Sequence, residues 1–579
     1  MFKTPRFDQA LNEYFSKLEL DENGGQWRTC RFSGEKFYVR PEDIEFYKKI
    51  RVPLPTLSAH ERIRRKLAFV NSYNLFHGTS ALTEKSIISA YPPGSLFKIY
   101  EHQAWFGEGW DPFAYGVSYD TTRPFWEQYR AFQLSVPRPN LTVDPTNVNS
   151  DYTNSSSRLK NCYLVFDSYG AEDCAYGIVF MNTQNCLEGL TLYNAQECYG
   201  GFESSELHRC FFVEYSKNCL DSYFLYDCRN CQNCFGCVNL RHKKYYFFNK
   251  PLTKEQYLAE LKRIDLGNRD VLREMAERFA EMKKSAIYKE THNERSINSF
   301  GDYLKNCKNC YASFYVRGGE NIAYALGGTE VKDALDLVGG VGSELCYDTY
   351  GGVQNFRILF SVGCDMCRSV EYCDGCINCH DCFACIGLKN KSFCIFNVQY
   401  SEDEYWKKLD EIKTAMFDKG EYGEFFPPHL SPFPYNLTYA TSYVGYDDVA
   451  VASKYGYQVN DVSEGEQQVD GELIVAHDLP PDVKDVSDEI LKKIIFDTKN
   501  SKKFRYTRQE LEFHHRFNIA LPTEHYSLRL LNMRKKLGSI VLKLHDRTCP
   551  KCGKIMQSSY APDRPEIVYC EQCYQAEVV

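Results

Sequence analysis

The stretch CDGCINCHDCFAC, from Cys373 to Cys385, places a cysteine at every third position. Such a spacing is compatible with an iron–sulfur or zinc site, with a knot of disulfides, or with the edge of a repetitive fold. The sequence of 579 residues contains 26 cysteines, so the choice among these interpretations decides much of the fold.

The cysteines fall into two blocks with short, regular steps. In the first block the steps are twelve, then nine, then three, and Asn or Asp often precedes the cysteine. The second block begins at Cys307 and contains the opening stretch. Short periods of this kind are typical of stacked coils. The cysteines of the first block are Cys162, Cys174, Cys186, Cys198, Cys210, Cys219, Cys228, Cys231, Cys234 and Cys237.

A β-solenoid explains both residue types. Asn and Asp tolerate a left-handed corner conformation and can stack as ladders between coils, and cysteine is small and apolar enough to point inward. We therefore predict two solenoid blocks, Cys162–Cys237 and Cys307–Cys385. The steps fit no single period, and coils of about 12, 18 or 24 residues are all compatible with them.

Metal binding by the opening stretch is the alternative. Bacterial ferredoxins use C-x2-C-x2-C-x3-C-P, whereas this stretch keeps a strict step of three and has no Cys-Pro pair. Its block also uses cysteines at steps too wide for local chelation. We predict reduced thiols without metal, and His380 within the stretch keeps the metal interpretation open.

The closing segments of the two blocks align without gaps at an offset of 148 residues. In each, a strand-like segment precedes a capping box, Thr253-x-x-Gln in the first and Ser401-x-x-Glu in the second. A capping box marks the start of a helix. We predict helical inserts at about 252–297 and 401–416 that cap the open solenoids.

A separate repeat relates the two terminal parts of the chain. Phe37–Thr56 matches Phe504–Thr523 at an offset of 467 residues, and residues 79–105 match residues 548–574 at an offset of 469. The sequence thus predicts two related terminal modules with the solenoid blocks between them.

The C-terminal module carries the most specific motif, C-x2-C-x17-C-x2-C. It is the spacing of a zinc ribbon, in which two knuckles each supply a pair of thiolates to a tetrahedral site. Four protein ligands leave no open position, so we predict one structural zinc ion and no catalytic metal. The four ligands are Cys549, Cys552, Cys570 and Cys573.

The N-terminal module lacks these ligands, because Ser80, Thr83, Glu101 and Ala104 stand at the matching positions. We predict a ribbon-like fold without metal that is held by packing. A cluster of aromatic residues is expected to supply that packing, with a sugar-binding surface as the alternative. These residues are Trp105, Trp110, Phe113, Tyr115 and Trp126.

Each terminal module also contains a basic segment, although the net charge of the chain is −8. Such segments could contact RNA, a ribosome or an acidic protein, and the alternative is a solvated helix face. The candidate partner-binding residues are Arg62, Arg64, Arg65, Lys66, Arg529, Arg534, Lys535 and Lys536.

Signals for catalysis or export are weak. The glycine-rich segment GGVGS at 339–343 lacks the Lys-Ser/Thr of a phosphate-binding loop, and no pair of carboxylates is marked as an acid–base dyad. The N-terminal segment lacks the apolar core of a secretory signal, and no run of about 20 apolar residues could cross a membrane. We expect a cytoplasmic protein with reduced cysteines, and the sequence leans against an enzyme and indicates no small-molecule substrate.

The Asn/Asp-Cys ladders, the closing segments at 242–257 and 390–405, and the terminal CPKCGKIMQSSYAPDRPEIVYCEQCY carry a resemblance. With them the chain resembles the cysteine-rich, zinc-ribbon-ended proteins of ultra-small candidate-phylum bacteria, sometimes labelled "Caib/baif family". The resemblance implies no activity. It implies cysteine pairs in the N-terminal module too, whereas this chain keeps only Cys30 there and has Ser58 and Asp497 at positions where the resemblance leads one to expect cysteine.

The sequence therefore predicts a mainly β protein with helical inserts, in which two cysteine-rich solenoid blocks are flanked by related zinc-ribbon-like modules. Its expected function is that of a non-enzymatic zinc-containing scaffold for a macromolecular partner. The alternatives are an RNA- or ribosome-associated factor and a metal or iron–sulfur redox protein that uses the cysteine ladder. The predicted segments are the N-terminal module (1–145), the first block with its cap (151–297), the second block with its cap (298–440), an acidic linker (441–500) and the C-terminal module (501–579).

Overall fold

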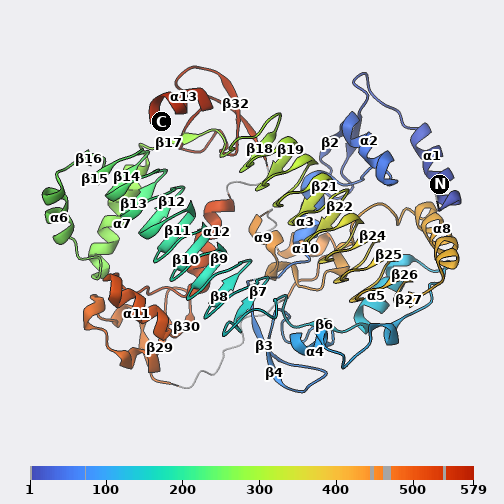
Figure 1. The fold of residues 1–579 in the computed structure, drawn as a ribbon, viewed down its shortest axis with the longest axis horizontal. Helices are drawn as coiled ribbons and strands as arrows, with labels where there is room; N and C mark the ends of the chain where they lie inside the picture. The colour runs from blue at the N-terminus through green and yellow to red at the C-terminus, as the bar shows by residue number, and fades with distance from the viewer. Residues whose placement is uncertain (1–2, 72, 444–448, 461–470, 539–542) are drawn as a thin grey trace. The chain divides into compact units, whose positions relative to one another are not determined.

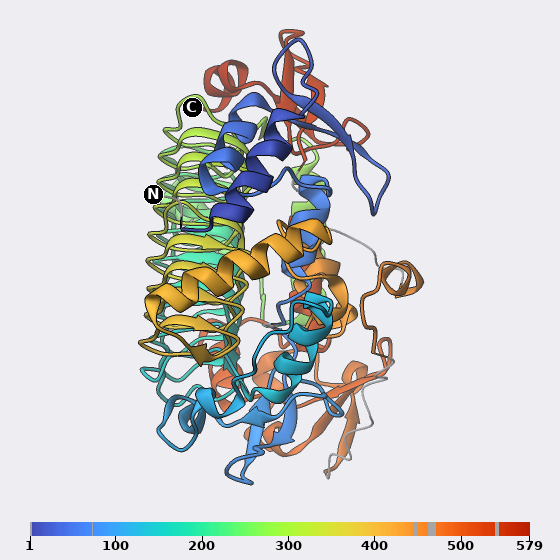
Figure 2. The ribbon, with the colours of Figure 1, turned by 90° about the vertical axis from the view of Figure 1, so that its right-hand side faces the viewer.

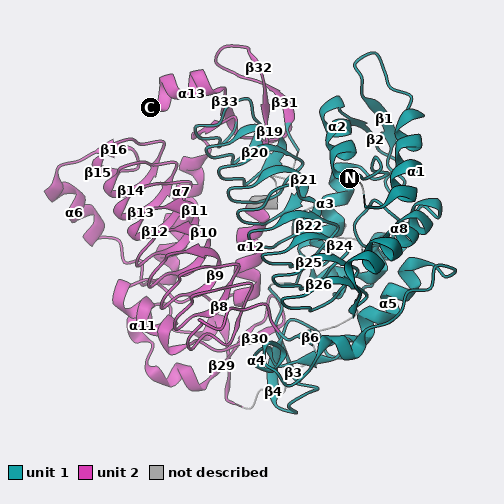
Figure 3. Ribbon diagram, turned by 45° about the vertical axis from the view of Figure 1, so that its right-hand side comes forward, with its two compact units in different colours: residues 1–140, 291–460, 541–544 teal, residues 141–290, 461–540, 545–579 magenta. Residues whose placement is uncertain are grey.

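The computed structural model describes residues 3–71, 73–443, 449–460, 471–538 and 543–579. The chain forms two compact units (Figure 3). Unit 1 comprises residues 1–140, 291–460 and 541–544, and unit 2 comprises residues 141–290, 461–540 and 545–579. Unit 1 therefore combines the N-terminal module with the second solenoid block, and unit 2 combines the first block with the C-terminal module.

The first block is a ten-stranded sheet in which neighbours along the chain are also neighbours in the sheet (Figure 1). Its strand pairs are parallel, except for the closing pair of β15 with β16. The strands are β7 (Thr153–Asn154), β8 (Tyr163–Phe166), β9 (Ala175–Met181), β10 (Leu187–Tyr193), β11 (Tyr199–Ser205), β12 (His208–Glu214), β13 (Leu220–Tyr226), β14 (Gln232–Val238), β15 (Lys244–Phe247) and β16 (Lys250–Pro251).

The second block repeats this arrangement in another ten-stranded sheet, again with one antiparallel pair at its end. Figure 2 shows its coils stacked one upon another. The strands are β18 (Phe300–Asp302), β19 (Lys308–Phe314), β20 (Glu320–Ala323), β21 (Lys332–Val338), β22 (Tyr347–Tyr350), β23 (Phe356–Leu359), β24 (Arg368–Glu371), β25 (His380–Phe383), β26 (Ser392–Ile395) and β27 (Val398–Gln399).

The coils of the solenoid contain 12 residues, except at the start of each block, where Val143 pairs with Ser156 and Phe300 with Tyr311. The registers pair Leu187 with Tyr199 and Arg368 with His380, and side-chain hydrogen bonds between coils also join residues 12 apart. Within a coil the backbone has a positive φ at every third residue. A coil therefore has four left-handed corners, and the cysteine steps of twelve, nine and three are all multiples of this three-residue side.

This geometry explains why Asn or Asp so often precedes cysteine. The residue before each inward-pointing position sits at a corner, as Asn161 does with a φ of 52°, and Asn and Asp tolerate that conformation better than most residues. The next residue points into the coil. The cysteines of the opening stretch are all at most 1% exposed, and no disulfide joins them.

Inward cysteines also satisfy backbone groups at the corners. The Cys385 N–H donates to Cys373 Sγ at 3.4 Å, and that thiol lies 3.5 Å from the carbonyl oxygen of Glu371. Serine does the same in other coils, where the Cys162 N–H donates to Ser150 Oγ at 3.0 Å. Cysteine is therefore both a small apolar filler and a weak hydrogen-bonding group here.

Replacing Cys373 by alanine is expected to lower the free energy of unfolding by about 1 kcal/mol, because it removes a small buried group and one weak acceptor. Cys373→Ser should cost less, since serine fills equivalent positions elsewhere. Urea unfolding of both variants measures this difference. A loss of several kcal/mol in both variants, together with loss of bound iron, would instead identify the ladder as a cluster site.

Helices close both blocks at the predicted places. The Thr253 and Ser401 hydroxyls accept hydrogen bonds from the N–H groups of Gln256 and Glu404, which completes the capping boxes. Helix α7 packs on the last coils of the first block and α8 on β26 of the second. These helices are α6 (Lys254–Lys262), α7 (Arg269–Lys283) and α8 (Glu402–Asp418).

The terminal modules share one order of elements. Helix α2 (Pro41–Ile50) corresponds to α11 (Arg508–Phe517) at an offset of 467, and both helices end in a left-handed residue, Arg51 and Asn518. Hairpin β3–β4 corresponds to β31–β32 at an offset of 469. The predicted relation between the modules is therefore confirmed. The hairpin strands are β3 (Phe76–Thr79), β4 (Ser86–Ser89), β31 (His545–Thr548) and β32 (Ile555–Ser558).

Shorter elements complete each module. In unit 1 they are α1 (Pro5–Ser16), β1 (Gln26–Thr29), β2 (Lys36–Val39), α3 (Ala59–Leu67), β5 (Ile99–Tyr100), α4 (His102–Phe106), η1 (Pro112–Tyr115), α5 (Phe125–Ser135), β6 (Arg138–Pro139), η2 (Pro428–Leu430), η3 (Tyr435–Leu437), α9 (Tyr439–Tyr443) and α10 (Val449–Lys454). In unit 2 they are β17 (Ile287–Lys289), β28 (Leu473–Val475), η4 (Ala476–Asp478), η5 (Val483–Asp485), η6 (Asp488–Lys492), β29 (Ile494–Asp497), β30 (Lys502–Phe504), α12 (Tyr526–Gly538), β33 (Ile567–Tyr569) and α13 (Glu571–Val578).

The segment 441–500, which the sequence predicts as an acidic linker, is folded in its described parts. Strands β28 and β29 form a three-stranded sheet with β30, and Ile490 and Ile495 are buried in the same core. Alternating acidic and apolar residues concealed this core from the sequence. Residues 444–448 and 461–470 of the segment lie outside the described residues.

Candidate functional site

The four predicted ligands come together in unit 2. Among the described residues, one group of three or more potential metal ligands has all its ligand atoms within 4.8 Å of one another. The distance between the Cys552 and Cys570 Sγ atoms is 3.7 Å. This group could hold a metal ion, and four thiolates would leave no position open for a substrate. Its members are Cys549, Cys552, Cys570 and Cys573.

Two knuckles position these thiols. The first follows β31, where the Gly553 N–H donates to the Cys549 carbonyl at 2.9 Å and Gly553 has a φ of 77°. The second follows β33, where Cys570 is the N-cap of α13. Burial disfavours a thiolate at Cys549, but hydrogen bonds from backbone N–H groups, first that of Cys570, outweigh it and lower the pKa to about 6. A thiolate is the form that binds metal.

In the N-terminal module hydrogen bonds take the place of these ligands. The Glu101 N–H donates to Ser80 Oγ at 3.1 Å, as the Cys570 N–H donates to Cys549 Sγ at 3.4 Å in the C-terminal module. The Thr83 hydroxyl donates to the Glu101 carboxylate at 3.2 Å. This ribbon therefore keeps its knuckles through direct side-chain contacts.

The aromatic cluster of the N-terminal module is packed, as predicted. Trp105 is buried and donates its indole N–H to the Pro137 carbonyl at 3.1 Å. Trp110 in turn donates to the Trp105 carbonyl at 2.7 Å. Phe113, Tyr115 and Trp126 are partly buried against the core clusters of unit 1. This arrangement favours core packing over a sugar-binding surface.

Each terminal module contains a second pair of turns like the metal-binding knuckles, but without four cysteines. In the C-terminal module these turns begin at Asp497 and His525. Asp497 accepts hydrogen bonds from the backbone N–H groups of Asn500 (3.2 Å) and His525 (3.3 Å). The equivalent positions in the N-terminal module, at an offset of 467, hold Cys30 and Ser58. Hydrogen bonds from Ser33, despite burial, lower the pKa of Cys30. Among the described knuckles, those of β31 and β33 alone carry four cysteines.

The basic residues of α3 are not an exposed patch, which corrects the sequence-based expectation. All four side chains are buried. The Arg62 guanidinium lies 2.8 Å from Asp336, and Lys66 Nζ lies 2.5 Å from Asp348. Arg64 pairs with Glu61, and Arg65 lies 3.6 Å from Glu424. Apart from Glu61 on the same helix, the acidic partners stand at solenoid corners and in a loop far away in sequence, so local charge alone could not identify them.

The basic residues of α12 divide into two groups. Arg529 is buried, forms an ion pair with Glu188 and lies 3.2 Å from Glu510. Arg534 is half-buried, whereas Lys535 and Lys536 are exposed. Lys536 lies 2.7 Å from Glu214. Of this predicted set, only the two lysines are available to a partner.

Arg62 and Arg529 belong to two equivalent charge clusters, which the sequence analysis missed. Both arginines come from the terminal modules, at an offset of 467, and their partners Asp336 and Glu188 come from solenoid corners, at an offset of 148. The hydrogen bonds correspond as well. In each unit the terminal module therefore contacts the solenoid block of that unit through residues at equivalent positions. The Tyr324 hydroxyl donates to Asp43 at 2.8 Å, and the Tyr176 hydroxyl donates to Glu510 at 2.9 Å.

The two clusters differ in charge balance. In unit 1 three cations face three carboxylates: Arg40, Arg62 and Lys66 with Asp43, Asp336 and Asp348. In unit 2 Thr507 and Met533 replace Arg40 and Lys66, and Gly200 replaces Asp348. Arg529 alone then faces two buried carboxylates. Burial accordingly raises the pKa of Glu510 to about 7.

The stability of unit 2 should depend on the ionisation of Glu510. Because its pKa is raised from 4.5 to about 7 in the folded state, its contribution is fully present below pH 4.5 and is lost as the pH rises through 7. Glu510→Gln should remove this loss, about 3 kcal/mol at the most, since one pKa unit corresponds to about 1.4 kcal/mol. Urea unfolding between pH 4.5 and pH 8 measures the difference between the two proteins.

Glu512→Gln, on the exposed face of the same helix, is the matched control and should follow the wild type. Burial lowers the pKa of His514 to about 4, so the contribution of His514 to the free energy of unfolding is lost as the pH drops below 6.5, opposite to the effect of Glu510. All three proteins keep His514, so its effect cancels in the comparison. Parallel pH profiles for wild type and Glu510→Gln would contradict the assignment.

A pocket of about 450 Å³ lies in unit 2 beside the ribbon and α12. Lys535, Lys536 and Arg564 line it together with Tyr288 and Tyr560. Arg564 pairs with Glu566 and Lys536 with Glu214, so Lys535 is the cation of this group without an ion pair among the described residues. Cations and aromatic rings here share one surface.

The chain matches no known family model, and no curated protein sequence matches it. Within the described residues, no helix has both the length and the apolar character needed to cross a bilayer.

Proposed function

We propose that the protein is a non-enzymatic scaffold with one structural zinc ion that binds a macromolecular partner. The zinc assignment is supported by the sulfur geometry. A tetrahedral site with Zn–S bonds of about 2.3 Å requires sulfurs about 3.8 Å apart. The Cys552–Cys570 separation of 3.7 Å is close to this value. The closed ligand set gives the metal a structural role.

The partner-binding part of the proposal rests on the 450 Å³ pocket beside the ribbon. The ribbon contributes Tyr560 and Arg564 to its lining, and α12 contributes Lys535 and Lys536. Zinc binding would therefore hold one wall of the pocket in place. The cations and rings of the pocket are groups that recognise a partner, which favours a binding role for this surface.

An RNA or ribosomal partner is the second candidate. The exposed lysines suit the phosphates of single-stranded RNA, and the half-buried rings of Tyr215 and Tyr288, which line the same pocket, offer surfaces for base stacking. A protein partner would use the same surface with acidic residues opposite the lysines. Nothing in the ladder geometry favours the redox alternative, and an absorption spectrum with iron analysis tests it.

Capture of partners by the full-length protein from its native cells, with identification by mass spectrometry and RNA sequencing, tests the proposal. Lys535→Glu should abolish capture of the specific partner, and Lys262→Glu, an exposed lysine of the same unit outside the pocket, should leave it unchanged. Nuclease treatment separates the two candidates. Capture that is insensitive to Lys535→Glu would contradict the proposed surface.

A further inference from the structure

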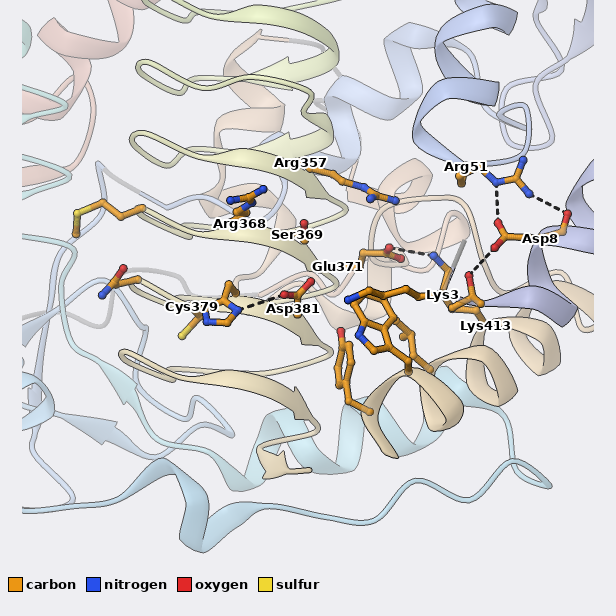
Figure 4. Close-up of a pocket in the computed structure, with 17 residues that line it drawn as sticks. Lys3, Asp8, Arg51, Arg357, Arg368, Ser369, Glu371, Cys379, Asp381 and Lys413 are labelled. Carbon is orange, nitrogen blue, oxygen red and sulfur yellow. Dashed lines mark hydrogen bonds and ion pairs between the residues drawn. The ribbon is translucent and has the colours of Figure 1, made fainter. Parts of the chain in front are cut away.

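A second pocket, of about 660 Å³, lies within unit 1 (Figure 4). Coils of the second block form one side, and α8 and the residues at the start of α1 form the other. The coil side repeats with the 12-residue period, so Arg357, Ser369 and Asp381 occupy equivalent corners of successive coils. Arg368 and His380, each one residue before such a corner, are likewise 12 residues apart and pair in the sheet.

The cations of this pocket outnumber its acids. Lys3, Arg51, Arg357, Arg368 and Lys413 face Asp8, Glu371 and Asp381. Arg51 lies 2.8 Å from Asp8, Lys413 lies 2.9 Å from Glu371, and Lys3 pairs with Glu402 outside the pocket. Arg357 and Arg368, by contrast, form no ion pair with any of the described residues.

Arg357 and Arg368 place two positive charges on adjacent coils without a counter-ion among the described residues. Adjacent strands lie about 4.8 Å apart, so Arg357 and Arg368 extend from neighbouring backbones into the same pocket. An anion bound in the pocket would neutralise these two charges. Arginine is suited to this role, because its planar donors match the oxygen atoms of phosphate and carboxylate groups in pairs.

We propose that this pocket binds a small organic anion through a phosphate or carboxylate group held by Arg357 and Arg368. The Ser369 hydroxyl lies between the two arginines on the coil surface and supplies a further donor (Figure 4). The opposite side offers the half-buried ring of Trp406, against which an apolar part of the ligand can pack. The volume lies within the range of pockets that hold small ligands. This inference is independent of partner binding in unit 2.

Isothermal titration of the full-length protein with pyrophosphate and, in a separate arm, with citrate tests the proposal. At least one of the two anions should bind saturably with one site per chain, and the stronger one distinguishes phosphate from carboxylate recognition. Arg357→Gln combined with Arg368→Gln should weaken this binding at least tenfold. Lys332→Gln, on an exposed coil position of the same block outside the pocket, should bind as the wild type does.

Arg368→Gln alone keeps the test decisive if the double variant unfolds, because Arg368 is exposed and its loss should not disturb the coil. It should weaken binding several-fold with an unchanged thermal unfolding curve in the absence of ligand. Absence of saturable binding of either anion to the wild type, or equal binding by wild type and Arg368→Gln, would overturn the proposal.

Discussion

Cys552→Ser is expected to contain no zinc, whereas the wild-type protein should contain one zinc ion per chain. Removing one of four thiolates opens the site, and the free energy of metal binding to such sites, about 10–16 kcal/mol in isolated peptides, is also folding free energy. The β31–β32 hairpin and α13 should therefore lose their structure together. Elemental analysis and hydrogen exchange of residues 543–579 measure the two effects.

The ladder provides the matched control for this experiment. Cys373→Ser changes a buried thiol of the same type but of a different role, and it should retain both the zinc and the protection of the ribbon. A chelator should reproduce the effect of Cys552→Ser on the wild type. Equal zinc content in wild type and Cys552→Ser would show that the four thiols do not form the site.

The solenoid and the ribbon could be predicted because each is encoded locally. A three-residue side forces a left-handed corner next to an inward position, so a pair such as Asn161-Cys162 records the geometry within two residues. The four ribbon cysteines likewise lie within 25 residues of one another. The coil length stayed open because several periods share the factor of three, and only the strand register resolves it as 12.

The charge clusters could not be predicted, because their members are separated by hundreds of residues. Arg62 and Lys66 look like solvated cations in the sequence, and only the docking of α3 on β21 and β22 brings Asp336 and Asp348 to them. The two offsets of 467 and 148 were both visible in the sequence. What was missing was the fact that unit 1 joins the first module to the second block.

Arg62→Met is expected to lower the free energy of unfolding of unit 1 by about 3–5 kcal/mol. The Asp336 side chain is fully buried, and loss of its partner leaves an uncompensated charge in the interior. Burial already raises the pKa of Asp336 to about 6 in the presence of Arg62. The variant should therefore be least stable above pH 6. There Asp336 either is an unpaired, buried carboxylate or must hold a proton that the unfolded chain would release. Urea unfolding at pH 5 and pH 8 measures this.

The second substitution separates charge from packing. Arg62→Met with Asp336→Leu removes both charges, and replacing a buried ion pair by apolar residues of similar size is often neutral or stabilising. The double variant should therefore recover most of the loss and its dependence on pH. Part of the loss should persist, because Arg62 also donates to the Leu57 carbonyl at 2.5 Å and that acceptor stays buried. Equal instability of the single and double variants would show that the Arg62–Asp336 ion pair does not hold α3 on the solenoid. The equivalent Arg529–Glu188 pair of unit 2 would then lose its assigned role as well.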